Sequence, residues 1–287
     1  MDGVAERNLA ALTGSVTIDA LCAARRRRQP WGRLKRNPVT GREQIDPTTV
    51  RESAGSGRPS DHRSSTLPWM DSPELRAIRS QVCRLAANWL ATAGDSMWVS
   101  AWETKNADLE ATALLTQMIG QLGQEAADAF DRERWYAATA LTRQIVEAYY
   151  LMAVFRDDAS QRRRWLRASN NRIEKSFRPG QMRQAAGFNV GEYKQHCAWG
   201  GHPNPSARWL LPNHHSDVSP AVLAADLAMH LTEAVDALAA ALNSLPGVRA
   251  VVEQMPEPGE LPETYSRWRA LDPLAERITL PDNPADL

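Results

Sequence analysis

The chain has 287 residues, with 34 basic and 34 acidic side chains, so its formal net charge at pH 7 is zero. This balance excludes a uniformly basic nucleic-acid coat protein and an acidic solvating chain, whereas 43% hydrophobic residues are ordinary for a globular protein. Three cysteines without a CxxC spacing favour neither a disulfide framework nor a zinc ribbon.

The N-terminal segment is basic and lacks a sustained hydrophobic period. Residues 1–60 carry eleven basic and six acidic side chains, and Pro and Gly recur along them. No apolar run follows the four arginines Arg25 to Arg28, so a twin-arginine signal peptide is not indicated. The sequence predicts that residues 1–67 form a basic, mostly disordered arm.

Apolar side chains recur every three or four residues in three successive segments, which is the spacing of one helix face. Asp71-Ser72-Pro73-Glu74 is typical of a helix start, and the first helix follows it. We expect the second helix at about 106–130 and the third at about 133–155. Their predicted inward residues are Leu75, Ile78, Val82, Leu85, Trp89 and Leu90; Leu109, Leu114, Met118, Leu122 and Ala126; and Ala138, Leu141, Ile145, Ala148, Met152 and Phe155.

The third predicted helix also carries a row of residues on its other side: Arg143, Glu147, Tyr150 and Val154. We therefore expect this helix to be central and covered on both faces. One interpretation of Arg143 and Glu147 is a structural ion pair four residues apart. The other is a buried pair that orients a partner, Tyr193 or His202. The structural interpretation is favoured.

The second half of the chain continues the helical pattern. A strongly basic helix is expected at 159–177, a short segment at 192–199 and a last long helix at 219–242, which Pro246-Gly247 stops. Residues 246–287 are proline-rich and acidic, with one short helix expected near 265–270.

These elements predict an all-α fold, without a strand signal. We expect a bundle of four to six helices in residues 68–245, between the polar N-terminal arm and the polar C-terminal tail. The most apolar long stretch, residues 221–242, contains Asp226, His230, Glu233 and Asp236 and is too polar to span a bilayer. We therefore expect no membrane partner and a cytoplasmic location.

Several common catalytic motifs are missing from the sequence. It contains no GxxxxGK[ST] loop and no GxGxxG after a strand, so nucleotide-binding P-loop and Rossmann sites are not indicated. It also lacks a GxSxG elbow and an HExxH helix, which excludes the common hydrolase and zinc-protease signatures.

The histidines are unevenly distributed. Four of the six lie within twenty residues, and a cysteine and an aspartate lie among them: His196, His202, His214, His215, Cys197 and Asp217. Imidazole and thiolate suit zinc, but the spacing fits no known ligand pattern, and capping or surface histidines are the simpler interpretation. We expect no metal and no cofactor.

Two basic segments are candidates for contact with nucleic acid. A solvated face is the usual interpretation of the run on the predicted helix 159–177, and the alternative is phosphate binding with Trp165 stacking on a base. The arginine cluster of the N-terminal arm is the better candidate for weak, salt-dependent contact.

The segment Leu141-Thr142-Arg143-Gln144-Ile145-Val146-Glu147-Ala148-Tyr149-Tyr150 places an Arg and a Glu four apart on an inner helix. Tyr193-Lys194-Gln195-His196, then His202-Pro203 and a final long helix follow it. This arrangement, over residues 135–242, resembles bacterial helical proteins that sit near the HEPN superfamily.

The resemblance implies a metal-independent endoribonuclease of a toxin or phage-defence system, which acts as a homodimer. The HEPN signature is an Arg followed by four to six residues and a His. It implies that Arg208 and His214 are the catalytic pair, with His202 as the second choice of histidine. The supporting residues would be Arg143, Glu147, Tyr193 and His196. Pro212, inside the signature, departs from the helical geometry of the family.

Two alternatives stay open beside RNA binding or cleavage. The first is a non-enzymatic interaction module that forms a dimer or binds a protein partner through exposed tryptophans and its oppositely charged termini. The second is a small-molecule enzyme whose site is built from residues scattered over several helices.

Overall fold

The computed structural model describes residues 72–201, 203, 205–211 and 220–276. Within these ranges the chain forms ten α-helices and no strand, so the predicted all-α class is confirmed. The predicted arm, residues 1–67, lies outside the described residues, as do His202, His214 and His215.

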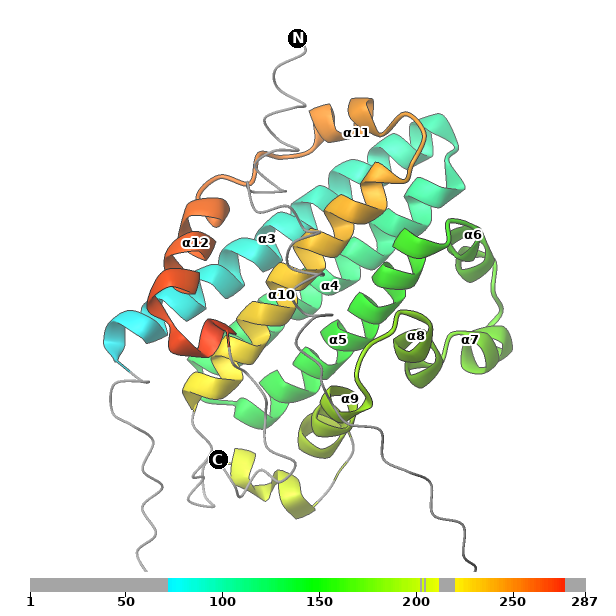
Figure 1. The fold of residues 1–287 in the computed structure, drawn as a ribbon. Coiled ribbons are helices and arrows are strands. Elements are labelled where there is room, and N and C mark those ends of the chain that lie inside the picture. The colour runs from blue at the N-terminus through cyan, green and yellow to red at the C-terminus, as the bar shows by residue number, and fades with distance from the viewer. Residues whose placement is uncertain (1–71, 202, 204, 212–219, 277–287) are drawn as a thin grey trace, which may run out of the picture. The chain divides into compact units, whose positions relative to one another are not determined.

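Four long helices form the bundle. They are α3 (Pro73–Thr104), α4 (Ala107–Asp131), α5 (Trp135–Asp157) and α10 (Pro220–Asn243). Figure 1 shows them running side by side, and α10 packs against each of the other three. Fully buried apolar side chains from all four helices form the core, among them Leu90, Met97, Ile119, Ile145, Met152, Leu231 and Leu238.

Local signals set the start of α3 and its junction with α4. The Ser72 hydroxyl accepts a hydrogen bond from the Leu75 amide at 3.2 Å, and Pro73 occupies the first helical position. Lys105 ends α3 with a left-handed φ of 53°. The next residue, Asn106, caps α4, because its side-chain oxygen accepts from the Leu109 amide at 3.1 Å.

Glycines allow α3 and α4 to approach each other closely. A Cβ atom on Gly120 would lie 2.6 Å from Cα of Ala91, and one on Gly94 would lie 2.8 Å from the backbone nitrogen of Gln117. A real Cβ atom does not come so close to backbone atoms. Glycine at these positions therefore permits the short distance between α3 and α4.

The inward face of α4 differs from the predicted one. Met118, predicted to face inward, is 46% exposed, whereas Leu115 and Ile119 are buried. Small residues, including Ala111, also face the core. A prediction based on large apolar side chains therefore assigns the buried face of α4 to the wrong side of the helix.

Helix α5 is central, as its two-sided pattern predicts. Ile145 and Phe155 are fully buried, and so is Tyr150 on the opposite side of the helix. It contacts α4 and α10 and also a set of short helices that follow it in the chain.

The basic helix predicted at 159–177 is in fact two helices, α6 (Ser160–Leu166) and α7 (Asn170–Ser176). Inside α6, Arg162 is fully buried and donates to the Ala241 carbonyl oxygen at 3.0 Å and to Ser244 Oγ at 2.6 Å.

Trp165, also on α6, packs edge-on against Phe155, with ring centroids 5.6 Å apart. It is partly buried against the core, and its stacking on a base stays a prediction. Helices α8 (Pro179–Ala185) and α9 (Val190–His196) follow, and α6, α7 and α8 lie along one edge of the bundle (Figure 1).

Helical packing continues beyond residue 245. Helices α11 (Val248–Gln254) and α12 (Leu261–Leu271) and a 3-10 turn at Pro273–Glu276 follow α10. Helix α12 packs against α3 and buries Trp268, so the packed helices extend past the predicted boundary of the tail. None of the described helices is long and apolar enough to cross a membrane.

Candidate functional site

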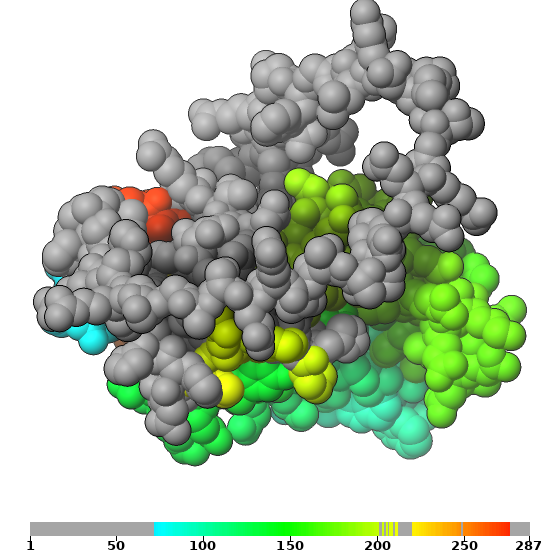
Figure 2. Space-filling view, turned by 90° about the horizontal axis from the view of Figure 1, so that it is seen from below, coloured from blue at the N-terminus to red at the C-terminus, as the bar shows by residue number. Residues whose placement is uncertain are grey.

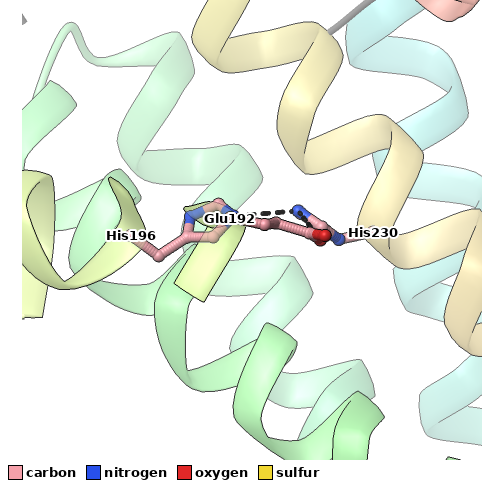
Figure 3. A group of neighbouring side chains, drawn as sticks. All are labelled: Glu192, His196 and His230. Atoms are coloured by element: carbon pink, nitrogen blue, oxygen red, sulfur yellow. Dashed lines mark hydrogen bonds and ion pairs between the residues drawn. The ribbon is translucent and has the colours of Figure 1, made fainter. Parts of the chain in front are cut away.

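Two buried histidines meet between α9 and α10. The Nε2 atoms of His196, the last residue of α9, and His230, in the middle of α10, lie 3.0 Å apart. Their side chains are 1% and 0% exposed. Figure 3 shows both side chains and that of Glu192 converging on the space between the two helices.

Carboxylates surround the histidine pair. Asp226 places Oδ1 3.4 Å from His230 Nε2 and Oδ2 3.8 Å from His196 Nδ1. Glu233 Oε2 lies 3.3 Å from His230 Nδ1, and Glu192 Oε1 lies 3.9 Å from His230 Nε2. These residues are three or four positions apart on their helices, so each helix presents its polar side chains on one face.

The environments of the two histidines push their pKa values apart. Burial lowers the pKa of His196 to about 4, and the attraction of Asp226 only partly offsets it. Burial also acts to lower the pKa of His230, but Asp226 and Glu233 outweigh it, so this pKa is raised. At neutral pH the pair is therefore one neutral and one protonated imidazole.

Asp226 is the buried counter-ion of this pair. Burial acts to raise its pKa, but His196 and His230 outweigh that effect, and the pKa is lowered. The carboxylate is therefore ionised at neutral pH and balances the charge of the imidazolium, as a buried charge requires.

A second polar layer lies beside the histidines. Arg143 and Glu147 form an ion pair at 2.8 Å, with side chains 18% and 21% exposed. Burial acts to lower the pKa of Arg143, but Glu147 and neighbouring groups, among them Cys197 and Tyr193, outweigh it and raise the pKa. Tyr193 hydrogen-bonds with both Arg143 and Cys197. Of the two partners considered for the ion pair, the structure thus places Tyr193 beside it, while His202 lies outside the described residues.

The hydroxyl of Tyr150 is a buried polar group next to this site. The side chain is fully buried, and its oxygen has no hydrogen-bond partner among the described residues. Its ring packs against Phe188, with centroids 4.9 Å apart, and near Tyr193 at 6.3 Å. Burial, with Glu192 nearby, raises the pKa of this phenol.

The segment that leads toward the predicted His-Pro turn is packed. Trp199 is fully buried in a small cluster with Leu210 and Leu223. A Cβ on Gly200 would lie 2.6 Å from the Ala140 backbone nitrogen, so the π-helical turn η2 (Cys197–Gly201) sits directly on α5.

The residues expected to cleave RNA are placed only in part. Arg208 is exposed on the 3-10 turn η3 (Pro205–Leu210), whereas His202 and His214 lie outside the described residues. The four supporting residues, Arg143, Glu147, Tyr193 and His196, all lie in the polar region between α5, α9 and α10.

Sequence reasoning missed the α10 half of the site. Asp226, His230 and Glu233 were informative only as interruptions of an apolar stretch. Their spacing of four and three residues on an otherwise apolar helix was the available signal, because such residues share one face and have to be buried with it.

The geometry identifies three possible metal ligands. One ligand atom each of Glu192, His196 and His230 lies within 4.8 Å of the other two. Of the histidine-rich segment considered for zinc, His196 belongs to this group and Cys197 does not, while His202, His214, His215 and Asp217 lie outside the described residues. Comparison of the chain with protein-family models, curated proteins and solved structures returns no significant match.

Proposed function

We propose that the protein binds RNA, as a HEPN-like helical protein, through the basic edge, which we define as residues 159–195. This segment carries nine basic and only two acidic side chains. The observation that carries the proposal is the exposure of seven of these cations: Arg163, Arg164, Arg167, Arg172, Lys175, Arg178 and Lys194.

A phosphate chain is the partner that this surface fits. Arginine side chains bind phosphate oxygens through several N–H groups, and each neutralised phosphate adds a salt-dependent increment of affinity. Among the seven exposed cations, Arg163 pairs with Asp108 at 3.1 Å. Figure 2 shows the yellow-green atoms of α6–α8 at the surface on one end of the view.

Binding is tested with single-stranded RNA and two triple variants of equal charge. Replacing Arg164, Arg167 and Arg172 by Ala removes three exposed cations of the basic edge. We expect weaker binding in fluorescence anisotropy and a slope of log K against log salt that is shallower by about 2.

The matched control replaces Arg132, Arg249 and Arg267 by Ala, which removes three exposed cations elsewhere in the chain. It should bind RNA like the natural protein. Equal weakening by the two triple variants would show that only net charge matters and would refute the basic edge as the binding surface.

Metal-independent cleavage in a bacterial toxin or phage-defence system is the finer form of this proposal. It rests on the resemblance to HEPN proteins and on the exposure of Arg208. Total RNA incubated with the protein in chelator should be cut, and Arg208→Ala and His214→Ala should abolish the cutting. Identical RNA profiles for the natural protein and both variants would refute the cleavage proposal without refuting RNA binding.

The second candidate function is a non-enzymatic interaction module that forms a homodimer. Two exposed apolar side chains on α3 support it. Trp102 is 68% exposed and Val99 is 54% exposed. The two side chains are three residues apart and share a helix face. Sedimentation should show a dimer that Trp102→Ala weakens, with Met118→Ala, a change at an exposed residue of α4, as the control. A monomer at every concentration would refute it.

A further inference from the structure

We propose that Glu192, His196 and His230 bind one divalent transition-metal ion of the zinc type between α9 and α10. Glu192 lies in the segment of the basic edge, but the site uses none of the exposed cations of that edge. It departs from the expectation of no metal. The two Nε2 atoms face each other, carboxylates lie beside both rings, and both histidines are buried.

The facing Nε2 atoms have the separation of two ligands on one metal ion. Zinc bound by histidines at 2.0–2.1 Å in a tetrahedron has ligand atoms about 3.3 Å apart. The Nε2 atoms of His196 and His230 lie 3.0 Å apart, and Glu192 Oε1 lies 3.9 Å from the latter. An ion between them would replace the proton that the two rings share.

The opposite nitrogen of each ring faces a carboxylate. His196 Nδ1 lies 3.8 Å from Asp226 Oδ2, and His230 Nδ1 lies 3.3 Å from Glu233 Oε2. Histidines that bind metals have such a carboxylate beside the second ring nitrogen. Here the two contacts have ion-pair distances and are not hydrogen bonds. Asp226 Oδ1 also lies 3.4 Å from His230 Nε2, on the side of the ion. Asp226 and Glu233 would balance the charge of a metal ion as they balance that of the imidazolium.

The Tyr150 hydroxyl is a second buried polar group beside the three ligands. It is fully buried without a hydrogen-bond partner among the described residues, and Glu192 and Glu233 are among the charged groups that act on it. A buried hydroxyl is normally paired. A water molecule or other small ligand on the metal ion would give it a partner.

Burial selects a small occupant. His196 and His230 are 1% and 0% exposed, so an RNA chain has no access to their ring nitrogens in this conformation. Two imidazoles and a carboxylate are ligands that zinc and its neighbours in the first transition row accept, whereas calcium and magnesium prefer oxygen.

The experiment is metal binding to the full chain. The purified protein is stripped with a chelator, dialysed and titrated with Co²⁺ and Zn²⁺. We expect one equivalent of Co²⁺ with visible d–d absorption, displacement of cobalt by Zn²⁺, and a higher melting temperature with either ion.

Three variants locate the ligands. His196→Gln, His230→Gln and Glu192→Gln should each weaken Co²⁺ affinity by at least about tenfold. Glu192 is the least buried of the three, with a side chain 21% exposed, so its variant keeps the test valid if the histidine variants fail to fold.

The matched control removes the competing histidines. The quadruple variant His62→Gln, His202→Gln, His214→Gln, His215→Gln should still bind one equivalent with unchanged affinity. Failure of the natural protein to bind either metal, or loss of the metal in the histidine control and not in Glu192→Gln, would overturn the site. RNA binding by the basic edge is unaffected by either result.

Discussion

Arg79 of α3 and Asp272, directly after α12, form a fully buried ion pair across 193 residues of sequence. Arg79 donates from Nε to Oδ2 at 2.6 Å and from a terminal nitrogen to Oδ1 at 2.8 Å. Trp268 also donates to Asp272 Oδ2, at 2.8 Å. Burial acts to raise the pKa of Asp272, but these partners outweigh it and lower the pKa. The pair fixes the C-terminal helix on the bundle.

Removing one partner of this pair should be costly. Asp272→Asn leaves a buried guanidinium without its counter-ion, and we expect the free energy of unfolding in urea to fall by about 3–5 kcal/mol. The control is Glu74→Gln, which breaks the exposed pair between Glu74 and Arg267 on the same two helices. It should change stability by less than about 1 kcal/mol. Similar losses in the two variants would contradict the importance of burial.

Neighbouring arginines on α6 should separate stability from RNA binding. Arg162→Ala removes the buried hydrogen bonds to Ala241 and Ser244 and should lower the free energy of unfolding by about 2–4 kcal/mol. Arg164→Ala removes an exposed side chain and should leave stability within about 0.5 kcal/mol while weakening RNA binding. Urea unfolding and anisotropy on both proteins check this. An unstable Arg164→Ala protein would contradict it.

The contact of α3 with α4 depends on Gly120. Gly120→Ala places a methyl group against the backbone of Ala91 and should destabilise the protein by about 1–3 kcal/mol. Gly180→Ala, in α8, meets nothing within 4 Å and should be neutral or stabilising by up to about 1 kcal/mol. Thermal melts compare the two. Equal melting temperatures of the two variants would show that the close contact of α3 with α4 does not contribute to stability.

Asp236 should make the protein less stable as pH rises. Burial, with Glu233 nearby, raises the pKa of Asp236 from 3.8 to about 6, and Tyr265 lies close enough for Asp236 to raise its pKa as well. Between about pH 4 and 6 the folded state binds more protons than the unfolded state, so stability falls as pH rises.

Asp236→Asn cannot ionise and should not show this fall. At pH 7 it should be about 3 kcal/mol more stable than the natural protein, and at pH 3.5 the two should be similar. Urea unfolding at several pH values measures the difference. Parallel stability curves for the two proteins would contradict the raised pKa.

The fold was predictable from sequence wherever local signals were strong. The caps at Ser72 and Asn106, and the period of the long helices, follow from side chains a few residues apart. Met118 was misplaced because alanines and glycines carry the close contact of α4, and these residues give little hydrophobic signal. Arg162 was read as solvated because its acceptors, at Ala241 and Ser244, are distant in sequence.

The candidate site was predictable by half. Arg143 and Glu147 signal themselves by their spacing on one helix, and Tyr193 and His196 by the motif that follows. The partner of His196 is His230, thirty-four residues later on α10. The clustering of histidines in the sequence does not predict this pair, because proximity in the chain does not determine which ring nitrogens meet in the fold.

The distance between Arg79 and Asp272 along the chain also has a consequence during translation. A ribosome adding about 5–20 residues per second needs roughly 10–40 s to make the 193 residues between them. Throughout that interval the nascent chain holds a charged arginine on the face of α3 that later becomes core. Docking of α12 is therefore a late event in biogenesis, and it joins the first described helix to the last.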